Sequence, residues 1–460
     1  MDAHSPEGFS PWASSGLLSS ARQRFVLAAV AAGLLWLATF WAGFGLVAPP
    51  SRVVPTAATP AFGTREPPAP ATPLRLVAMA GTPAPGGGSY DRFGIEDQSV
   101  APAVNGRGDV AFFARLMRSS ADEGLFLASN GHAALVAQTG GNAPGGGTIS
   151  SFTDHPAPAL NGSGEVAFAA GVDGGHTTAA LLAWKAGRLS ALAESGAKAP
   201  GVAGGAFFDF GSPAINDASD VAFLATVRRG HETVDAIYRR GRDGLTKVVA
   251  AGDPAPGGGT FSGLGAPAIN NKGVVAFAAV VEQGQNPGGI YATGPSGLRR
   301  LVGAGDAAPG GGIYARISEH VGLDDSGRVA FVAMLGDTAS RSAVILAGEA
   351  GASRVAALGT PAPGGGSFAS FGEAASLAAD GQLAFIASVQ GGPGTTGAWL
   401  TGPNGVKRVA GVGDTLADGR PISYFPLAPT IGAGPGGHVA FPAGVRASET
   451  PSDAIVAYAP

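Results

Sequence analysis

The chain has 460 residues, a formal net charge of −4 and no cysteine, and only 13% of its residues are charged. The absence of cysteine excludes disulfides, thiolate metal sites and a cysteine nucleophile, and the negative net charge argues against a nucleic-acid-binding surface. Glycine is abundant, with 76 residues, but it recurs at fixed places between apolar runs, which is typical of turns in a folded β protein.

The N-terminal region predicts a membrane anchor. Residues 25–47 form an uncharged apolar run of 23 residues, which as a helix would span about 35 Å and cross a bilayer core of about 30 Å. A cleavable signal peptide is the alternative, but the apolar core of such a peptide is shorter. Because Arg22 and Arg24 precede the run, we expect residues 1–24 to be a short cytoplasmic tail and the rest of the chain to lie outside.

Residues 48–73 predict a linker. They combine many prolines with alanine and threonine, a composition that favours a semi-extended spacer over a packed element. The linker would hold a domain at residues 74–460 away from the membrane.

A phrase of the form Asn-x-x-Gly-x-x-Ala-Phe organises residues 74–460. Its seven copies, three of them complete, end at Phe112, Phe168, Phe223, Phe277, Phe331, Phe385 and Phe441. Neighbouring copies are 54 to 56 residues apart. A near-constant period over seven copies indicates one structural unit repeated seven times.

Each residue of this phrase has a predicted structural role. The first asparagine can bond to its own backbone and begin a tight turn, as at Asn105, Asn161, Asn216 and Asn270. The glycine three residues later supplies a positive φ in that turn, as at Gly108, Gly164 and Gly273. The Val-Ala-Phe that follows is apolar on both faces of a strand, which suits a sheet packed between two neighbours.

Each unit is interpreted as a four-stranded antiparallel meander. In the first unit the strands are expected at residues 99–105, 109–116, 124–129 and 133–139, with a tight Asn-Gly turn before the last of them. A recurring Pro-Gly-Gly-Gly phrase, as at residues 85–88, is interpreted as a structural linker between units. A phosphate-binding loop would need a following helix and a Lys-Ser or Lys-Thr pair.

The two ends of the repeat region are out of phase. Residues 74–79 look like a fourth strand that lacks its sheet, and the last unit stops at its third strand, residues 454–458. Placing these two segments side by side closes a ring. The sequence therefore predicts an all-β fold, a seven-bladed β-propeller of four-stranded antiparallel blades, preceded by one transmembrane helix. An open solenoid is the alternative, but it gives no reason for the phase shift.

The repeated phrase resembles that of a family of bacterial tandem-repeat proteins named for the Asn-x-x-Gly-x-x-Ala-Phe motif. The resemblance covers residues 74–460 and implies an exported, variably anchored, propeller-like protein. Four positions depart from the phrase: Ser219 replaces its glycine, and Asp324, Ala378 and Gly434 replace its asparagine. The resemblance implies an extracytoplasmic setting and no catalytic residues.

Candidate ligand-binding residues are expected at the mouth of the central channel, where propellers usually bind ligands. We expect the Pro-Gly-Gly-Gly segments, the starts of the innermost strands and the loops between second and third strands to line that mouth. The polar residues that fall there are Asp97, His155, Asp209, Glu319, His320 and Glu373. A histidine among carboxylates suits acid–base or metal chemistry, and simple solvation of strand ends is the alternative. Because these residues take different offsets in different units, we predict no metal, no cofactor and no catalytic residue.

Two functions remain open. The first is a membrane-anchored binding or scaffolding module at the cell envelope, which contacts the membrane through residues 25–47 and an envelope protein or glycan through the propeller. The second is an envelope enzyme, a lyase or hydrolase acting on glycans or peptides at the channel mouth. Clustering of His155, His320 and two carboxylates would favour the enzyme.

Overall fold

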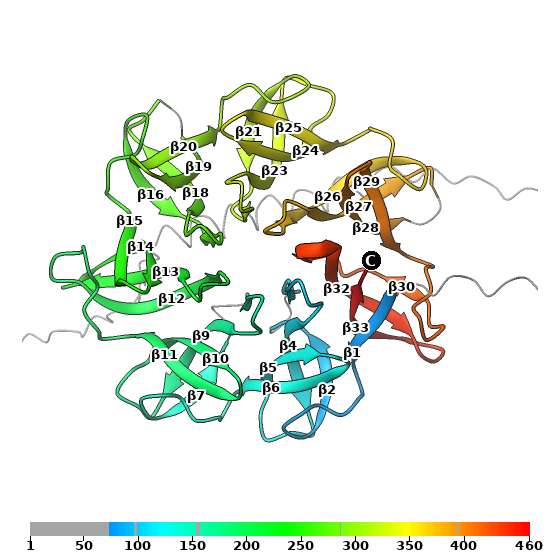
Figure 1. Cartoon of the computed structure of the whole chain (residues 1–460), viewed down its shortest axis with the longest axis horizontal. Helices are drawn as coiled ribbons and strands as arrows, with labels where there is room; N and C mark the ends of the chain where they lie inside the picture. Colours follow the sequence, from blue (N-terminus) through cyan, green and yellow to red (C-terminus); the bar gives the residue numbers. More distant parts are fainter. Residues whose placement is uncertain (1–72, 96–98, 153–156, 286, 393–394) are drawn as a thin grey trace, which may run out of the picture. The chain divides into compact units, whose positions relative to one another are not determined.

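The computed structural model describes residues 73–95, 99–152, 157–285, 287–392 and 395–460, all of which belong to one compact unit, Pro68–Pro460. This unit contains seven antiparallel sheets arranged in a ring (Figure 1). The predicted seven-bladed β-propeller is therefore confirmed. The tail, the anchor and nearly all of the linker, expected at residues 1–24, 25–47 and 48–73, lie outside the described ranges. Within those ranges, no helix has the length and hydropathy of a membrane span.

The second strand of each sheet carries the Val-Ala-Phe of the repeated phrase or its equivalent. These strands are β4 (Val110–Met117), β9 (Val166–Asp173), β13 (Val221–Arg229), β18 (Val275–Glu282), β23 (Val329–Gly336), β27 (Leu383–Gln390) and β32 (His438–Arg446). All seven phenylalanines of the phrase are at most 1% exposed. They are buried because each sheet is covered on both faces by its neighbours, as the apolar pattern predicts.

The third and fourth strands complete the outer part of each sheet. The third strands are β5 (Glu123–Ser129), β10 (Ala179–Lys185), β14 (Glu232–Gly241), β19 (Gly288–Gly294), β24 (Ser342–Gly348), β28 (Thr396–Gly402) and β33 (Pro451–Tyr458). The fourth strands are β6 (His132–Gln138), β11 (Arg188–Glu194), β15 (Gly244–Ala250), β20 (Gly297–Gly303), β25 (Gly351–Ala357), β29 (Gly405–Gly411) and β1 (Leu74–Met79). We number the sheets 1 to 7 from the one that contains β4 to the one that contains β32.

The first strand of most sheets is split into two pieces that both pair with the second strand. The pieces are β2 (Ser89–Phe93) and β3 (Ala103–Val104), β7 (Thr148–Ser151) and β8 (Ala159–Leu160), β16 (Thr260–Leu264) and β17 (Ala268–Ile269), β21 (Ile313–Ile317) and β22 (Gly322–Leu323), and β30 (Ile422–Tyr424) and β31 (Gly432–Gly434). In sheets 3 and 6 the strand is continuous but its register shifts, in β12 (Ala206–Ile215) and β26 (Ser367–Leu377).

The expected first strand at residues 99–105 is therefore wrong in its extent. Only Ala103–Val104 pairs there, and the other half of the strand, Ser89–Phe93, lies directly after a Pro-Gly-Gly-Gly turn. Pro102 directly precedes this short piece, but proline at this place does not by itself explain the split. Sheets 2 to 4 also have a proline three residues before the asparagine. In sheet 3 this residue, Pro213, lies within the continuous strand β12 opposite Phe223, whereas sheets 5 and 7 are split without a proline there.

The ring closes as the phase shift predicts. Strand β1 pairs antiparallel with β33, and Leu76 lies opposite Val456. Sheet 7 is therefore composite, with its outermost strand supplied by the N-terminal side of the repeat region. The core consists of seven apolar clusters, and each combines one face of a sheet with the facing side of the next. A 3-10 turn, Pro435–Gly437 (η1), precedes β32.

Candidate functional site

Each blade has two opposite ends, at which different turns and loops connect its strands. At the end that we call the motif end lie the turns of the repeated phrase and the hairpin turns between third and fourth strands. At the other, the glycine-turn end, lie the Pro-Gly-Gly-Gly turns and the loops between second and third strands. The antiparallel registers fix this division, since Val110 at the start of β4 pairs with both Val104 and Ala128, and Ser89 pairs with Met117 at the end of β4.

The motif turns of neighbouring sheets are joined by asparagine side chains. The Oδ1 of Asn105 accepts the backbone N–H groups of Arg107 and Asp109, at 3.0 and 3.1 Å, as the predicted turn requires. Its Nδ2 donates across the seam to the carbonyl oxygen of Asn161, at 3.1 Å. One asparagine thus forms the turn of its own sheet and fastens it to the next.

The same bond repeats along the ring and forms what we call the asparagine ladder. Asn161 donates to the carbonyl of Asn216 at 3.2 Å, Asn216 to Asn270 at 2.9 Å, and Asn270 to Asp324 at 2.9 Å. The ladder ends at Asp324, because an aspartate side chain has no N–H group to donate to the following sheet. The ladder therefore joins sheets 1 to 5.

The glycine position of the phrase is fixed by two constraints. All seven residues there have φ between +63° and +88°, including Ser219, so the predicted positive φ is confirmed. A Cβ added at Gly164 would also lie 2.6 Å from Arg107 Nη2 of the preceding sheet, and one at Gly273 would lie 2.6 Å from Arg239 Nη2. In these two sheets the end of an arginine side chain of the preceding sheet occupies the space that a Cβ would need, whereas at Gly327 of sheet 5 a Cβ would meet nothing within 4 Å.

A buried carboxylate follows the glycine position of the phrase in sheets 1 to 3, where sheet 3 has Ser219 in place of glycine. Asp109, Glu165 and Asp220 are 3%, 8% and 7% exposed. Each has a cation of its own sheet: Arg107 Nη2 lies 2.5 Å from Asp109, Lys185 Nζ 3.1 Å from Glu165, and Arg239 Nη2 2.6 Å from Asp220. These ion pairs stand beside the ladder and were not among the predicted site residues. Their shared offset in the repeat is the signal that could have identified them.

The carboxyl of Asp109 illustrates the electrostatics of this region. Burial alone would raise the pKa of Asp109, but hydrogen bonds from Ser129, Asn105 and Arg107 outweigh burial and lower that pKa below its usual value. Hydrogen bonds to the charged form favour it. The carboxylate is thus held ionised as part of the turn.

The closing seam between sheets 7 and 1 uses different groups. Arg75 Nη2 of β1 donates to the carbonyl of Gly108 at 2.6 Å, and the imidazole of His438 lies beside the same glycine. Burial, together with the charge of Arg75, lowers the pKa of His438. A neutral histidine and a cation therefore meet where the two ends of the repeat region join.

The Pro-Gly-Gly-Gly segments do not lie where the sequence placed them. In sheet 1 the glycines Gly86, Gly87 and Gly88 have φ of 93°, 113° and 75°, and Ala84 N donates to Gly88 O at 3.1 Å. This tight turn folds over its own sheet, and an added Cβ at Gly86 would meet Leu135 of the outermost strand. The segments connect the fourth strand of one sheet to the first strand of the next, as predicted, but they cover the outer part of a blade and do not line a central mouth.

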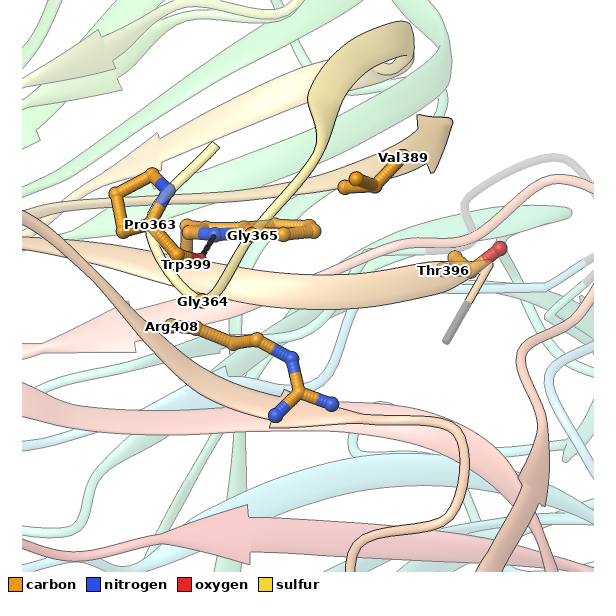
Figure 2. A pocket seen from close by; sticks show the side chains of 7 residues that line it. All are labelled: Pro363, Gly364, Gly365, Val389, Thr396, Trp399 and Arg408. Atoms are coloured by element: carbon orange, nitrogen blue, oxygen red, sulfur yellow. Dashed lines mark hydrogen bonds between the residues drawn. The ribbon is translucent and has the colours of Figure 1, made fainter. Parts of the chain in front are cut away.

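Sheet 6 shows the same turn from close by (Figure 2). Trp399 Nε1 donates to the carbonyl of Pro363 at 3.3 Å, and the side chain of Arg408 lies against Gly364 and pairs with Asp414 at 3.0 Å. The hollow that remains encloses about 10 Å³, roughly the room for one water molecule. The turn is thus packed against the sheet and leaves no space for an organic ligand.

The predicted site residues are only partly described. Asp97 and His155 lie outside the described ranges. Glu319 and His320 are exposed on the connection between β21 and β22, and Glu373 is exposed within the register shift of β26. Asp209 lies in β12, where its Oδ1 accepts the N–H of Phe210 at 2.8 Å.

The four predicted site residues that the structure describes therefore lie in the middle of first strands or in the connections within them. Where the chain is described, no three histidine or acidic side chains come together as metal ligands. The proposed grouping of His155 with His320 is untested, because His155 lies outside the described residues.

Exposed large apolar side chains lie toward one end of sheets 1, 3, 5 and 7. The described chain has six of them, and each lies in a first or second strand toward the glycine-turn end or in a connection within a first strand: Met117, Phe208, Ile313, Met334, Tyr424 and Leu427. Phe208 is covered on one side by the guanidinium of Arg228, 3.7 Å from the ring centre. None is placed at the motif end.

A cluster of arginines in the sequence of sheet 3 is divided by the fold. Arg228 and Arg229 lie at the glycine-turn end of β13, whereas Arg239 and Arg240 lie at the motif end of β14, where Arg240 pairs with Val221. Arg239 forms an ion pair with Asp220. These four arginines therefore do not form one basic patch.

Comparison with known proteins places the chain in a family. No protein of curated function matches its sequence. Among solved structures, it is similar to an oligogalacturonate lyase in complex with manganese (12% identity, 84% of this chain and 96% of that chain, TM-score 0.47), a puromycin-hydrolysing peptidase of Mycobacterium tuberculosis (15%, 75% and 49%, 0.45) and a gluconolactonase of Xanthomonas campestris (11%, 81% and 98%, 0.33).

These structural similarities are too distant to carry a conclusion about a site or an activity. The family match is of a different kind, because residues 69–238 and 220–458 each match one family and together span most of the chain. The exported setting implied by the motif resemblance stays a proposal. The chain belongs to the family of unknown function DUF7453.

Proposed function

We propose that this protein is a membrane-anchored binding module of the cell envelope and that it contacts its partner through the glycine-turn end of the propeller. The observation that carries the proposal is the distribution of exposed large apolar side chains. All six that the described chain contains lie toward that end or in the connections within first strands. They are distributed over sheets 1, 3, 5 and 7, so the proposed surface is shared by several blades, and exposed apolar area is a feature of interaction surfaces.

The chain path supports the same surface. Leu74 pairs with Tyr458, and Tyr458 also pairs with Val439 at the start of β32. Both termini of the described region therefore lie at the motif end. The proposed contact surface lies at the opposite end of the blades.

The envelope setting comes from the sequence. The uncharged run at residues 25–47, with Arg22 and Arg24 before it, is of a length that crosses a bilayer. The motif resemblance implies an exported protein. Together these features support a propeller outside the cytoplasm, with an envelope protein or glycan as the proposed partner.

The test is a capture experiment with the full-length chain in detergent. The immobilised protein is exposed to envelope proteins and to envelope glycans, and bound material is quantified for the unaltered chain and for the double variant Phe208→Lys with Met334→Lys. We expect the variant to lose at least about tenfold in affinity, the equivalent of about 1.4 kcal/mol. The matched control is Ser353→Lys, an exposed residue of β25 toward the motif end of sheet 5, which should bind normally.

Two results would count against the proposal. One is unchanged capture by the double variant when its thermal unfolding matches that of the unaltered chain. The other is loss of capture by Ser353→Lys alone, which would move the surface to the motif end. The second candidate, an envelope lyase or hydrolase, is tested in the same preparation by assaying glycan and peptide cleavage before and after His155→Ala and His320→Ala.

A further inference from the structure

Four asparagines of this chain are followed by glycine: Asn105, Asn130, Asn161 and Asn404. An Asn-Gly pair can modify itself. The backbone nitrogen of the glycine attacks the side-chain carbonyl carbon, a C–N bond closes a five-membered ring, and the side-chain nitrogen leaves as ammonia with the proton of the backbone nitrogen. Water then opens the ring at either carbonyl to give aspartate or isoaspartate, so no oxidant or enzyme is needed. Glycine offers the least hindrance to this attack because it has no Cβ.

Two of the four pairs are open to this chemistry in the folded protein. Asn130-Gly131 lies in the hairpin turn between β5 and β6, Asn404-Gly405 lies in the turn between β28 and β29, and all four residues are exposed. An added Cβ on either glycine would meet nothing within 4 Å. In the described part of the chain, neither asparagine side chain has a hydrogen-bond partner.

The other two pairs are held in the asparagine ladder. Asn105 and Asn161 are 2% and 3% exposed, and the Nδ2 of each donates to the carbonyl of the next sheet. Their Oδ1 atoms each accept two backbone N–H groups of their own turn. The backbone N–H of Gly162, whose nitrogen would have to attack, donates a hydrogen bond to Asp217 Oδ1 at 2.7 Å. Cyclisation at these positions requires that these bonds first break.

We propose that Asn130 and Asn404 are sites of spontaneous deamidation in the folded protein, and that the closed ring protects Asn105 and Asn161, which become modified only when their seam opens. The consequences differ between the two pairs. Deamidation in an exposed hairpin turn adds one negative charge to the surface. Deamidation in the ladder removes the Nδ2 donor and leaves a carboxylate facing the carbonyl oxygen of the next sheet.

The chain contains its own example of that outcome. Asp324 occupies the ladder position of sheet 5, where its carboxylate accepts Ser326 N and Arg328 N at 3.0 and 2.8 Å and donates nothing to sheet 6. Aspartate can thus accept the hydrogen bonds that form the turn, but it has no donor with which to join two sheets. A ring that opens for long enough to deamidate at Asn105 or Asn161 would therefore lose a seam bond permanently.

The first experiment follows all four sites by peptide mass spectrometry in the full-length chain, kept in detergent in mildly alkaline buffer. We expect Asn130 and Asn404 to convert at least about tenfold faster than Asn105 and Asn161, because modification of the buried pair must wait for local opening. The same chain in denaturant should convert all four at similar rates. Equal rates in the folded protein, or slower conversion at the exposed pair, would overturn the proposal.

The second experiment measures how loss of the asparagine Nδ2 donor affects refolding. Asn105→Asp and Asn130→Asp are unfolded in denaturant, diluted and compared with the unaltered chain in the recovered folded signal. We expect Asn105→Asp to recover a smaller fraction and Asn130→Asp to match the unaltered chain. Full recovery by Asn105→Asp would contradict the claimed role of the ladder donor. If neither variant can be prepared folded, the site-by-site conversion rates of the unaltered chain still decide the proposal.

Discussion

The seams that join sheets 1 to 5 differ from the seam that closes the ring. In the former, one asparagine amide in each turn donates to the next turn. In the latter, a strand from the far end of the repeat region completes sheet 7, and Arg75 reaches the carbonyl of Gly108. The difference shows that a repeat can fasten consecutive copies with a bond encoded in every copy, whereas closure requires a contact between the two ends of the repeat region.

The seams between sheets 5, 6 and 7 form a third, mixed class. Asp325 N donates to the carbonyl of Ala379 at 2.9 Å, and Asp380 Oδ2 accepts Gly436 N at 2.7 Å. Both bonds involve the backbone, so these seams tolerate the loss of asparagine from the phrase. The irregular copies of the phrase are therefore compensated rather than defective.

The largest expected effect comes from removing the closing strand. Deletion of residues 74–79 removes the buried Leu74 and Ala78 and the Arg75 bond, and should lower the free energy of unfolding by more than about 3 kcal/mol. Denaturant titration of the full-length chain in detergent measures the change. Deletion of the six linker residues 60–65 is the control of equal length. Equal stability of both deletions would show that β1 does not close the ring.

Breaking the ladder should have the next largest effect. Asn216→Ala removes the bond to Asn270 and leaves the N–H groups of Ala218 and Asp220 without their acceptor, at a cost of about 2–3 kcal/mol. Ala378→Asn, at the ladder position of sheet 6, should instead gain up to about 1 kcal/mol by supplying the missing donor. Thermal unfolding of the two variants checks both signs. Destabilisation by Ala378→Asn would mean that the mixed seams cannot accept the repeat bond.

A smaller effect separates the two constraints on the glycine position. Gly327→Ala meets no neighbour within 4 Å and has φ of +85°, so it should cost only the backbone strain of about 1 kcal/mol. Gly164→Ala has almost the same φ but would also displace Arg107, and should cost up to about 3 kcal/mol. Identical losses of stability would indicate that Arg107 moves aside freely.

The smallest effect is a pH dependence at the closing seam. Burial and Arg75 lower the folded-state pKa of His438, so the unfolded chain binds the proton more readily. Stability from the neutral imidazole is therefore complete above its ordinary pKa of about 6.5 and declines as pH falls below that value. We expect His438→Gln to flatten the dependence of the unfolding midpoint on pH between about 7 and 5. His320→Gln, on an exposed connection, should keep the slope of the unaltered chain.

The repeat count, the strand order and the closure follow from sequence because they depend on local patterns. Phe112 and its six equivalents mark strands buried on both faces, and their spacing counts the sheets. The surplus strand at residues 74–79 identifies the missing partner of residues 454–458 because only one strand edge in the ring is incomplete. These inferences need no knowledge of how one sheet is rotated against the next.

The seams and the candidate site depend on that rotation, and the tertiary structure decided them. The asparagine that begins each turn was predicted, but its second bond joins residues 54 to 56 positions apart, and no local pattern reports which atoms meet at that separation. The lack of a local signal for long-range contacts also explains why the sequence wrongly predicted the Pro-Gly-Gly-Gly turns at the mouth of the central channel. Their sequence specifies positive φ at Gly86, Gly87 and Gly88, whereas the contact of Gly86 with Leu135 arises only when the turn folds back over its sheet.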